Sequence, residues 1–202
     1  MKSKSSISDF PSAREDVARA SEALVSVSKA LGALNPEDIV VTAEIIEDCL
    51  RRKKRILLLG NGGSCATASH LATDLTLIAR DAKFCAYVTA LNDNPYLVTA
   101  MANDYGFAES GAALVESTSS PDDALLIFSC SGRSPNLVQA ANAAARVGVL
   151  TILIGSVLAP HSFPASYRIL VQSERYSVIE AAHTALVHVV IDLIRSHLGL
   201  ES

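Results

Sequence analysis

The stretch GNGGSCATASHLATDL, residues 60–75, places two kinds of chemistry in one segment. Its glycines let the backbone approach a ligand closely, and the free N–H groups at the start of the following helix favour an anion. Ser64 can cap that helix. His70 and Asp74 are one helical turn apart, so both side chains can reach a single metal ion or proton. The alternative is a surface helix with two solvated polar groups, and the adjoining loop favours the functional interpretation.

A second loop of small residues, SCSGRSP at 129–135, has the same organisation. It offers three hydroxyls, a glycine and an arginine, and Pro135 suits the first turn of the following helix. Either loop alone would be interpreted as an ordinary strand–helix turn with capping serines. Two such loops beyond the carboxyl ends of strands favour phosphate binding. Cys65 stands where a Rossmann fingerprint needs glycine, and neither loop has the lysine of a P-loop, so a sugar phosphate fits better than a nucleotide.

Five apolar runs have the length of β-strands, and most of them do not alternate with polar residues. This pattern is typical of parallel strands that are covered on both faces. The runs are 55–60, 83–91, 123–130, 149–155 and 167–172. Helical stretches lie between them, at about 65–79, 95–102, 107–118 and 135–147. Strands that alternate with helices through short links predict an α/β fold with a parallel sheet.

Two helices are predicted before the first strand, after a flexible segment at 1–11. The first helix is expected to begin at residue 11 or 12 and to run to about residue 34. Asn35 and Pro36 then predict the N-cap and first position of a second helix, which runs to about residue 53. The first helix has an apolar stripe, formed by Val17, Ala20, Leu24, Val27, Ala30 and Leu31.

The last stretch, 177–197, is predicted to form one long helix rich in apolar residues. It is too apolar for the surface of a monomer, so we expect it in the core or in a subunit interface. The chain as a whole is predicted to form a single domain over 12–202, with the N-terminal helices in 12–54 and the α/β core in 55–202.

The composition argues against several classes of protein. A net charge of −4 and a pI of about 5.7 do not suit a broad nucleic-acid or acidic-membrane surface. The chain lacks the apolar stretch of a signal peptide and any run of the roughly 18 apolar residues that a membrane helix needs. Its four cysteines show no C-x-x-C spacing and are expected to be reduced and mostly buried. The sequence therefore predicts a cytoplasmic protein with no membrane or nucleic-acid partner.

The basic run RRKKR, residues 51–55, has two interpretations. It ends the second predicted helix, where lysine and arginine complement the helix dipole. The alternative is a patch for an acidic partner, and the first interpretation is favoured.

Five motifs, taken together, resemble a known family. They are GNGGS, H-x-x-x-D, MANDYGF (101–107), SCSGRSPN (129–136) and IEAAHTALVH (179–188), in this order and with consistent spacing. The set resembles the sugar isomerase (SIS) domain, and most closely the sedoheptulose 7-phosphate isomerases, also called phosphoheptose isomerases. The resemblance implies a flavodoxin-like three-layer αβα sandwich with a five-stranded parallel sheet. It also implies a homotetramer with active sites at subunit interfaces and one zinc ion in each site.

The activity that the resemblance implies is an aldose–ketose isomerisation. Sedoheptulose 7-phosphate would become D-glycero-D-manno-heptose 7-phosphate by proton transfer through an enediol. Such a reaction needs a base near the carbon, an acid or metal at the carbonyl oxygen and a remote anchor. The phosphate loops also suit a rival from another class, a non-catalytic SIS-domain regulator or adaptor that binds sugar phosphate. Retained His70 and His188 favour the enzyme.

The resemblance assigns a role to each matching position. Catalysis falls to Asp74 and His188, and metal binding to these two residues with His70 and Glu180. Asp74 stands where the family has glutamate, and Glu180 where it has glutamine. Helix geometry alone would pair Glu180 with His183, one turn away, rather than with His188. Substrate contacts are expected from the two loops, from an Asn-Asp pair and from the final helix, at Asn61, Gly62, Gly63, Ser64, Asn103, Asp104, Ser129, Cys130, Ser131, Ser134 and Glu180.

Overall fold

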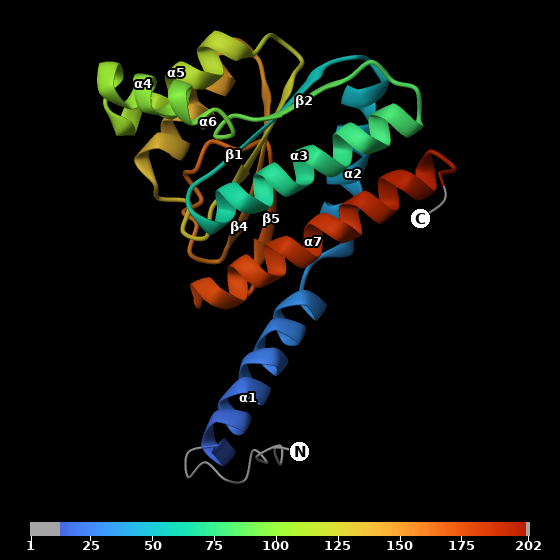
Figure 1. The fold of residues 1–202 in the computed structure, drawn as a ribbon, viewed down its shortest axis with the longest axis vertical. Coiled ribbons are helices and arrows are strands. Elements are labelled where there is room, and N and C mark those ends of the chain that lie inside the picture. Colours follow the sequence, from blue (N-terminus) through green and yellow to red (C-terminus); the bar gives the residue numbers. More distant parts are fainter. Residues whose placement is uncertain (1–12, 201–202) are drawn as a thin grey trace, which may run out of the picture.

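The computed structural model describes residues 13–200, whose strands form a five-stranded parallel sheet between two layers of helices (Figure 1). The predicted flexible segment, 1–11, lies outside the described residues. The strand order is β2-β1-β3-β4-β5, which is the flavodoxin-like order. The predicted α/β class and three-layer architecture are confirmed. The strands are β1 (Arg55–Gly60), β2 (Tyr87–Ala90), β3 (Ala124–Phe128), β4 (Leu150–Ser156) and β5 (Tyr167–Val171).

Helices cover both faces of this sheet, and β1 shows why its strands are continuously apolar. Ile56 and Leu58 of β1 pack in the core under one helical layer, whereas Leu57 and Leu59 pack in the core under the other. The first layer holds α2 (Pro36–Arg51), α3 (Gly63–Asp81) and α7 (Tyr176–His197). The second layer holds α4 (Pro95–Tyr105), α5 (Phe107–Thr118) and α6 (Pro135–Val147).

Strand β2 is shorter than predicted, because the preceding residues close helix α3. A strand was expected over 83–91, but pairing with β1 begins only at Tyr87. Lys83 adopts a positive φ of 58°, and the Phe84 N–H donates to the Ala79 carbonyl at 2.7 Å. These are the features of a Schellman C-cap, in which the left-handed position is most often glycine.

Replacing Lys83 with glycine is expected to raise the free energy of unfolding by about 0.5–1 kcal/mol. Lys83 is exposed, and a left-handed φ costs an L-residue more than it costs glycine. Chemical denaturation of the Lys83→Gly variant measures the change. The matched control is Gly148→Ala, because Gly148 ends α6 with a φ of 84° and its replacement should destabilise the protein. If Gly148→Ala lowers the free energy of unfolding as expected but Lys83→Gly lowers it too, this account of the cap is contradicted.

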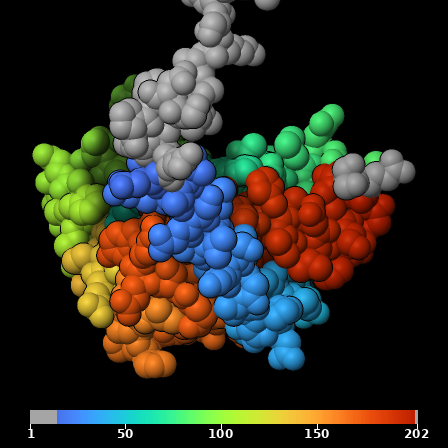
Figure 2. Space-filling model, turned by 90° about the horizontal axis from the view of Figure 1, so that it is seen from below, coloured from blue at the N-terminus to red at the C-terminus, as the bar shows by residue number. Residues whose placement is uncertain are grey.

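Helix α1 (Ala13–Gly32) extends away from the rest of the fold (Figure 1). Its C-terminal part packs against the end of β5 and the start of α7, where Ala30 is buried with Val178 and Ile179. Seen from below, the blue residues of α1 stand in front of the orange and red segments that they cover (Figure 2). Val17 and Leu24, in the predicted apolar stripe, remain exposed. The described chain therefore covers only one end of that stripe.

Helix α7 is, among the described residues, the helix that is long and apolar enough to cross a membrane by length and composition alone. Half of its apolar window is buried inside the fold. Leu186 and Val190 belong to the same core as α2 and α3. The core placement predicted for 177–197 is confirmed for the buried part of the helix, which accounts for its apolar composition.

All four cysteines lie within the described residues and are free thiols, as predicted. The prediction that they are mostly buried is wrong. Cys49 is buried, Cys65 and Cys130 are half-buried and Cys85 is exposed. Cys85 lies in the connection between α3 and the edge strand β2, which is covered less than the central strands. Burial raises the pKa of the Cys49 thiol to about 11.

Candidate active site

The two loops of small residues leave the sheet side by side. β1 and β3 are parallel neighbours, with Gly60 in register with Phe128, so both loops begin at the carboxyl edge of the sheet. They border a hollow of about 160 Å³ together with the start of α7. This hollow is lined by Asn61, Ser64, Phe128, Ser129, Cys130, Ser131, Ser134, Leu137, Tyr176 and Glu180. The structure thus brings most of the predicted loop residues into one place.

The first loop is shaped by glycines rather than by a capping serine. Gly62 is the N-cap of α3, with a φ of 55°, and no side chain caps the helix. Ser64 lies inside the first turn and is buried, so its predicted capping role is wrong. A Cβ on Gly63 would lie 2.8 Å from the Glu180 carboxylate. Glycine at this position therefore lets α7 place Glu180 against the loop.

The second loop is held by its own hydroxyls. The Ser129 hydroxyl accepts a hydrogen bond from the Gly132 N–H at 3.1 Å, and the Ser131 hydroxyl accepts one from the Arg133 N–H at 3.2 Å. The Ser134 hydroxyl does not cap α6, although Ser134 is the N-cap and lines the hollow. Ser134 therefore has its hydroxyl available for a ligand at the start of a helix, where an anion is favoured.

Cys130 contributes to the second loop through its backbone. Its carbonyl accepts a hydrogen bond from the Ser156 hydroxyl at 2.6 Å, which ties the loop to the end of β4. Burial, and then the negative charge of Glu180, raise the pKa of the Cys130 thiol. The thiol is consequently protonated at neutral pH and is not a nucleophile.

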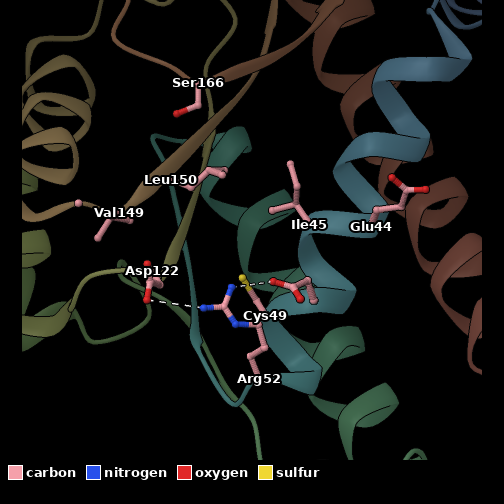
Figure 3. Close-up of a pocket in the computed structure, with 10 residues that line it drawn as sticks. Glu44, Ile45, Cys49, Arg52, Asp122, Val149, Leu150 and Ser166 are labelled. Atoms are coloured by element: carbon pink, nitrogen blue, oxygen red, sulfur yellow. Dashed lines mark hydrogen bonds and ion pairs between the residues drawn. The ribbon is translucent and has the colours of Figure 1, made fainter.

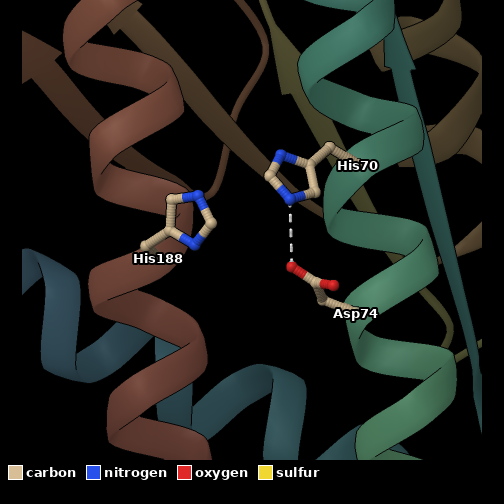
Figure 4. A group of neighbouring side chains, drawn as sticks. All are labelled: His70, Asp74 and His188. Carbon is tan, nitrogen blue, oxygen red and sulfur yellow. Dashed lines mark ion pairs between the residues drawn. The ribbon is translucent and has the colours of Figure 1, made fainter.

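Three candidate acid–base and metal-binding residues meet in the space between α3 and α7 (Figure 4). His70 and Asp74 come from α3, and the His70 Nε2 atom lies 3.2 Å from the Asp74 Oδ2 atom. His188 comes from α7, and its ring centroid lies 4.9 Å from that of His70. One ligand atom from each residue lies within 4.8 Å of the other two. Two imidazoles and a carboxylate form a donor set that zinc binds in proteins.

Glu180 is not brought into this group of three. It lies two turns before His188 on α7, and its carboxylate reaches back to Gly63. Glu180 lines the hollow beside the phosphate loops and also a second hollow of about 490 Å³, which His70 lines as well. Glu180 therefore borders both the hollow of the loops and the hollow that His70 lines. The structure does not support its predicted place among the metal ligands.

His183 is directed into the core and away from the three grouped residues. It is fully buried, its Nε2 atom lies 3.0 Å from the Gly155 carbonyl and its ring packs at 6.0 Å against Phe128. Burial lowers the pKa of His183 below its ordinary value of 6.5. The alternative that paired Glu180 with His183 is therefore not supported, and His188 is the histidine of α7 that meets His70.

The buried His183 is expected to make stability fall as the pH is lowered. Its pKa is depressed in the folded state, so below pH 6.5 the unfolded chain binds a proton that the folded chain does not. The free energy of unfolding should fall from pH 7 toward pH 5, with a contribution of at most about 1.4 kcal/mol per pH unit. Denaturant titrations at both pH values give the free energy of unfolding, which should fall less between pH 7 and pH 5 for His183→Gln than for the wild type. The control His161→Gln, at an exposed position, should show the same fall in unfolding free energy as the wild type. An equal fall in the two variants would show that His183 is not the source of the pH dependence.

The predicted pair Asn103 and Asp104 lies elsewhere, near the end of α4. Both side chains are exposed, and the Asn103 Nδ2 atom donates to the Asp104 Oδ1 atom at 2.9 Å. Neither residue lines the two hollows described above. Within the described chain, these residues do not meet the loops.

Sequence reasoning missed two residues of the site. Asn136, at the start of α6, exchanges two side-chain hydrogen bonds with Asn61, each 2.9 Å long. Tyr176, the first residue of α7, lines the hollow with the loop serines. Asn136 ends the motif SCSGRSPN, so a polar residue two positions into a helix beside a phosphate loop was the available signal.

Another hollow, of about 520 Å³, lies near the amino ends of the strands and is lined partly by the basic run (Figure 3). Arg52 lines it, and its guanidinium pairs with Asp48 at 3.0 Å and with Asp122 at 3.6 Å. Arg51 pairs with Glu47, and Lys54 pairs with Asp122. These local ion pairs favour the interpretation of the basic run as a helix terminus over that of a patch for an acidic partner.

Comparisons with known proteins agree with this fold. The family model described as "SIS domain" matches residues 20–156. A phosphoheptose isomerase from Chlorobaculum parvum is 34% identical over 167 residues, which cover 80% of this chain and 79% of the relative. The structure of a phosphoheptose isomerase from Neisseria gonorrhoeae matches with a TM-score of 0.79 and 28% identity, covering 91% of this chain and 98% of that one. A phosphoheptose isomerase structure from Francisella tularensis matches in fold with a TM-score of 0.80 and 24% identity, covering 93% and 100% of the two chains.

Proposed function

The chain belongs to the SIS-domain family of phosphoheptose isomerases, and from this premise we propose that it interconverts sedoheptulose 7-phosphate and D-glycero-D-manno-heptose 7-phosphate. The observation that carries the proposal is the position of Glu180. It lines both the hollow of the phosphate loops and the hollow that reaches His70. One elongated substrate can therefore hold its phosphate in the loops and present its carbonyl end to His70, Asp74 and His188.

The loops would serve as the remote anchor. Their hydroxyls and the start of α6 favour an anion without a large excess of positive charge, which suits a phosphate monoester. Binding at this end fixes the distance of the reacting carbons from the acid–base groups. Glu180 beside the anchor places a negative charge next to the substrate's hydroxyl-bearing carbons, where it can accept hydrogen bonds.

Asp74 and His188 are the proposed acid–base pair. A base takes a proton from C1 of the ketose while the C2 oxygen gains a proton, which gives the enediol. The proton then returns to C2 as the O1 hydroxyl loses its own, and the aldose forms. Overall, one proton moves from C1 to C2 and one from O1 to O2, so the reaction needs no external oxidant or reductant. Asp74 lies 3.2 Å from the His70 Nε2 atom, and one ligand atom of His188 lies within 4.8 Å of both residues, so the two groups face the same small space.

The same three residues fit a zinc ion. Donor atoms around a tetrahedral zinc lie roughly 3.3 Å apart, so a separation within 4.8 Å needs only small side-chain rotations. His70, Asp74 and His188 would hold the ion, and the fourth position would stay open, as in catalytic sites. When bound, zinc would supply Lewis-acid polarisation of the carbonyl oxygen.

A homotetramer with sites at subunit interfaces is part of the proposal. Helix α4 has no buried residue, and it exposes Tyr96, Tyr105 and the following Phe107. Helix α1 exposes Val17 and Leu24. Exposed apolar faces of this kind are typical of contacts between copies. In such an assembly, Asn103 and Asp104 of α4 would complete the site of a neighbouring subunit.

A cytoplasmic location is proposed as well. The four free thiols suit a reducing compartment.

The experiment that tests the proposed function is incubation of the purified protein with sedoheptulose 7-phosphate and chromatographic analysis of the product. Five-carbon and six-carbon ketose phosphates serve as comparison substrates. Formation of the heptose 7-phosphate in preference to the shorter aldoses would support the proposal. Binding of the heptulose phosphate without turnover of any of these substrates would favour the non-catalytic regulator, which the replacements at Asp74 and Glu180 leave as the second candidate.

A further inference from the structure

The two loops of the site are joined directly by a pair of asparagines. The Asn61 Nδ2 atom donates to the Asn136 Oδ1 atom, and the Asn136 Nδ2 atom donates to the Asn61 Oδ1 atom, both at 2.9 Å. Asn61 follows β1 and Asn136 lies in the first turn of α6, just after the second loop. Reciprocal bonds of this kind fix both the spacing and the relative orientation of the two segments.

Burial makes this pair costly to break. Asn136 is 3% exposed, so its amide has no water to replace Asn61. The amide oxygen and one N–H of Asn61 are also used by Asn136, which limits what Asn61 can offer to a ligand. Asn61 is therefore expected to act on the substrate mainly by fixing the geometry of the loops.

Asn136 is held from the other side as well. A Cβ on Gly111 of α5 would lie 2.1 Å from the Asn136 backbone oxygen, so the first turn of α6 packs directly on the α5 backbone. The backbone of Asn136 thus packs against α5, and its side chain is held by Asn61. The start of α6, beside Ser134, is consequently held at a set position relative to the first loop.

We infer that Asn136 is a positioning residue, and that the Asn61–Asn136 amide pair sets the distance between the two loops so that both contact one phosphate group. The inference rests on the proposed function, since it concerns the anchor of the same site. A carboxylate in place of either amide would lose one of the two hydrogen bonds and add a negative charge close to the anion. An amide is the side chain that can donate and accept here without charge.

The test is a double-mutant cycle with Asn61→Ala, Asn136→Ala and the double variant. The readouts are the Kd for inorganic phosphate from titration calorimetry and the KM for sedoheptulose 7-phosphate. Each single variant is expected to raise both constants about tenfold, because the remaining amide is left unpaired and the loops lose their spacing. The double variant should be no weaker than the weaker single variant, because its second substitution removes an amide that has already lost its partner.

A second variant separates positioning from simple space filling. Asn136→Asp keeps the shape of the side chain, so a merely structural role predicts constants near the wild type. The inference predicts a Kd for phosphate at least as high as that of Asn136→Ala, because two oxygens then face each other and a charge is added. Thermal unfolding of each variant shows that the folded state is being measured.

The outcomes distinguish this inference from the proposed function. Multiplied losses in the double variant, or an Asn136→Asp variant with wild-type constants, would overturn the inference even if the wild type produces the aldose phosphate. A wild type that binds phosphate and forms no aldose would contradict the proposed reaction, and the cycle on the phosphate Kd would still test the inference. A wild type that does not bind phosphate overturns both.

Discussion

Replacing Asp74 with asparagine should lower kcat by about 10²–10⁴-fold, the range that a positioned acid–base group contributes. Asparagine keeps the size of the side chain but removes both the base and the charge that His70 contacts at 3.2 Å. KM should change little, because the phosphate loops lie beyond Glu180 and are untouched by the substitution. Steady-state kinetics with sedoheptulose 7-phosphate measures both constants.

The matched control for this prediction is Asp81→Asn. Asp81 is on the same helix, two turns further along, and its carboxylate pairs with Arg195 at 3.5 Å. Its loss should leave kcat near the wild-type value. Asp74→Glu, which supplies the carboxylate that the family resemblance leads one to expect, should retain far more activity than Asp74→Asn. An Asp74→Asn variant with wild-type kcat would show that Asp74 is not an acid–base group of the reaction.

Removal of zinc should lower turnover by roughly a hundredfold or more, because Lewis-acid stabilisation of the carbonyl oxygen is worth several kcal/mol. Dialysis against a chelator, followed by readdition of zinc, should abolish and then restore the activity. His70→Ala should prevent the restoration, because it removes one of the three ligand atoms that lie within 4.8 Å of one another.

Metal content gives a readout that does not depend on activity. The wild type is expected to retain about one zinc per chain after gel filtration, the stoichiometry of a single three-ligand site, and His70→Ala should retain much less. The control His197→Ala changes a histidine near the end of α7 that contacts Glu47 at 3.1 Å, and it should keep the wild-type zinc content. Full activity in the chelated protein, with no zinc detected, would contradict the metal assignment while leaving the acid–base assignment open to its own test.

The fold could be predicted from sequence because its strands are buried on both faces. The runs at 55–60 and 149–155 are apolar except for Arg55 and Thr151, and β1 and β4 follow them to within one residue. The exception was the edge strand β2. Its apolar residues looked like a nine-residue strand, but Lys83 adopts a left-handed conformation to end α3, and this tertiary requirement is not visible in the apolar pattern.

The site was predictable where it is local in the sequence. The glycines and serines of each loop, and the spacing of His70 and Asp74 on one helix face, carry their own geometry. The approach of His188 to His70 depends on how α7 packs beside α3, which spacing within α7 does not determine. For the same reason helix geometry alone favoured His183, whose position in the core only the tertiary structure shows.

The long-range contact between Asn61 and Asn136 was also beyond sequence reasoning. Each asparagine has an ordinary local explanation, one as a loop residue and the other as a polar residue near a helix start. Only the parallel pairing of β1 and β3 brings the two together. Ser64 shows the opposite error, because a good N-cap residue was available and the chain used Gly62 instead.

The most direct test of the central claim is proton NMR of sedoheptulose 7-phosphate incubated with the zinc-loaded protein in D₂O. The account predicts that the aldose phosphate appears with deuterium at C2, and that deuterium enters C1 of the remaining ketose, because a proton leaves C1 and returns through an acid–base group that exchanges with solvent. With Asp74→Asn, neither the aldose phosphate nor the incorporation of deuterium at C1 should be detected. A protein that binds the ketose phosphate but gives neither aldose nor deuterium exchange would contradict the enediol isomerase and identify the site as one for binding alone.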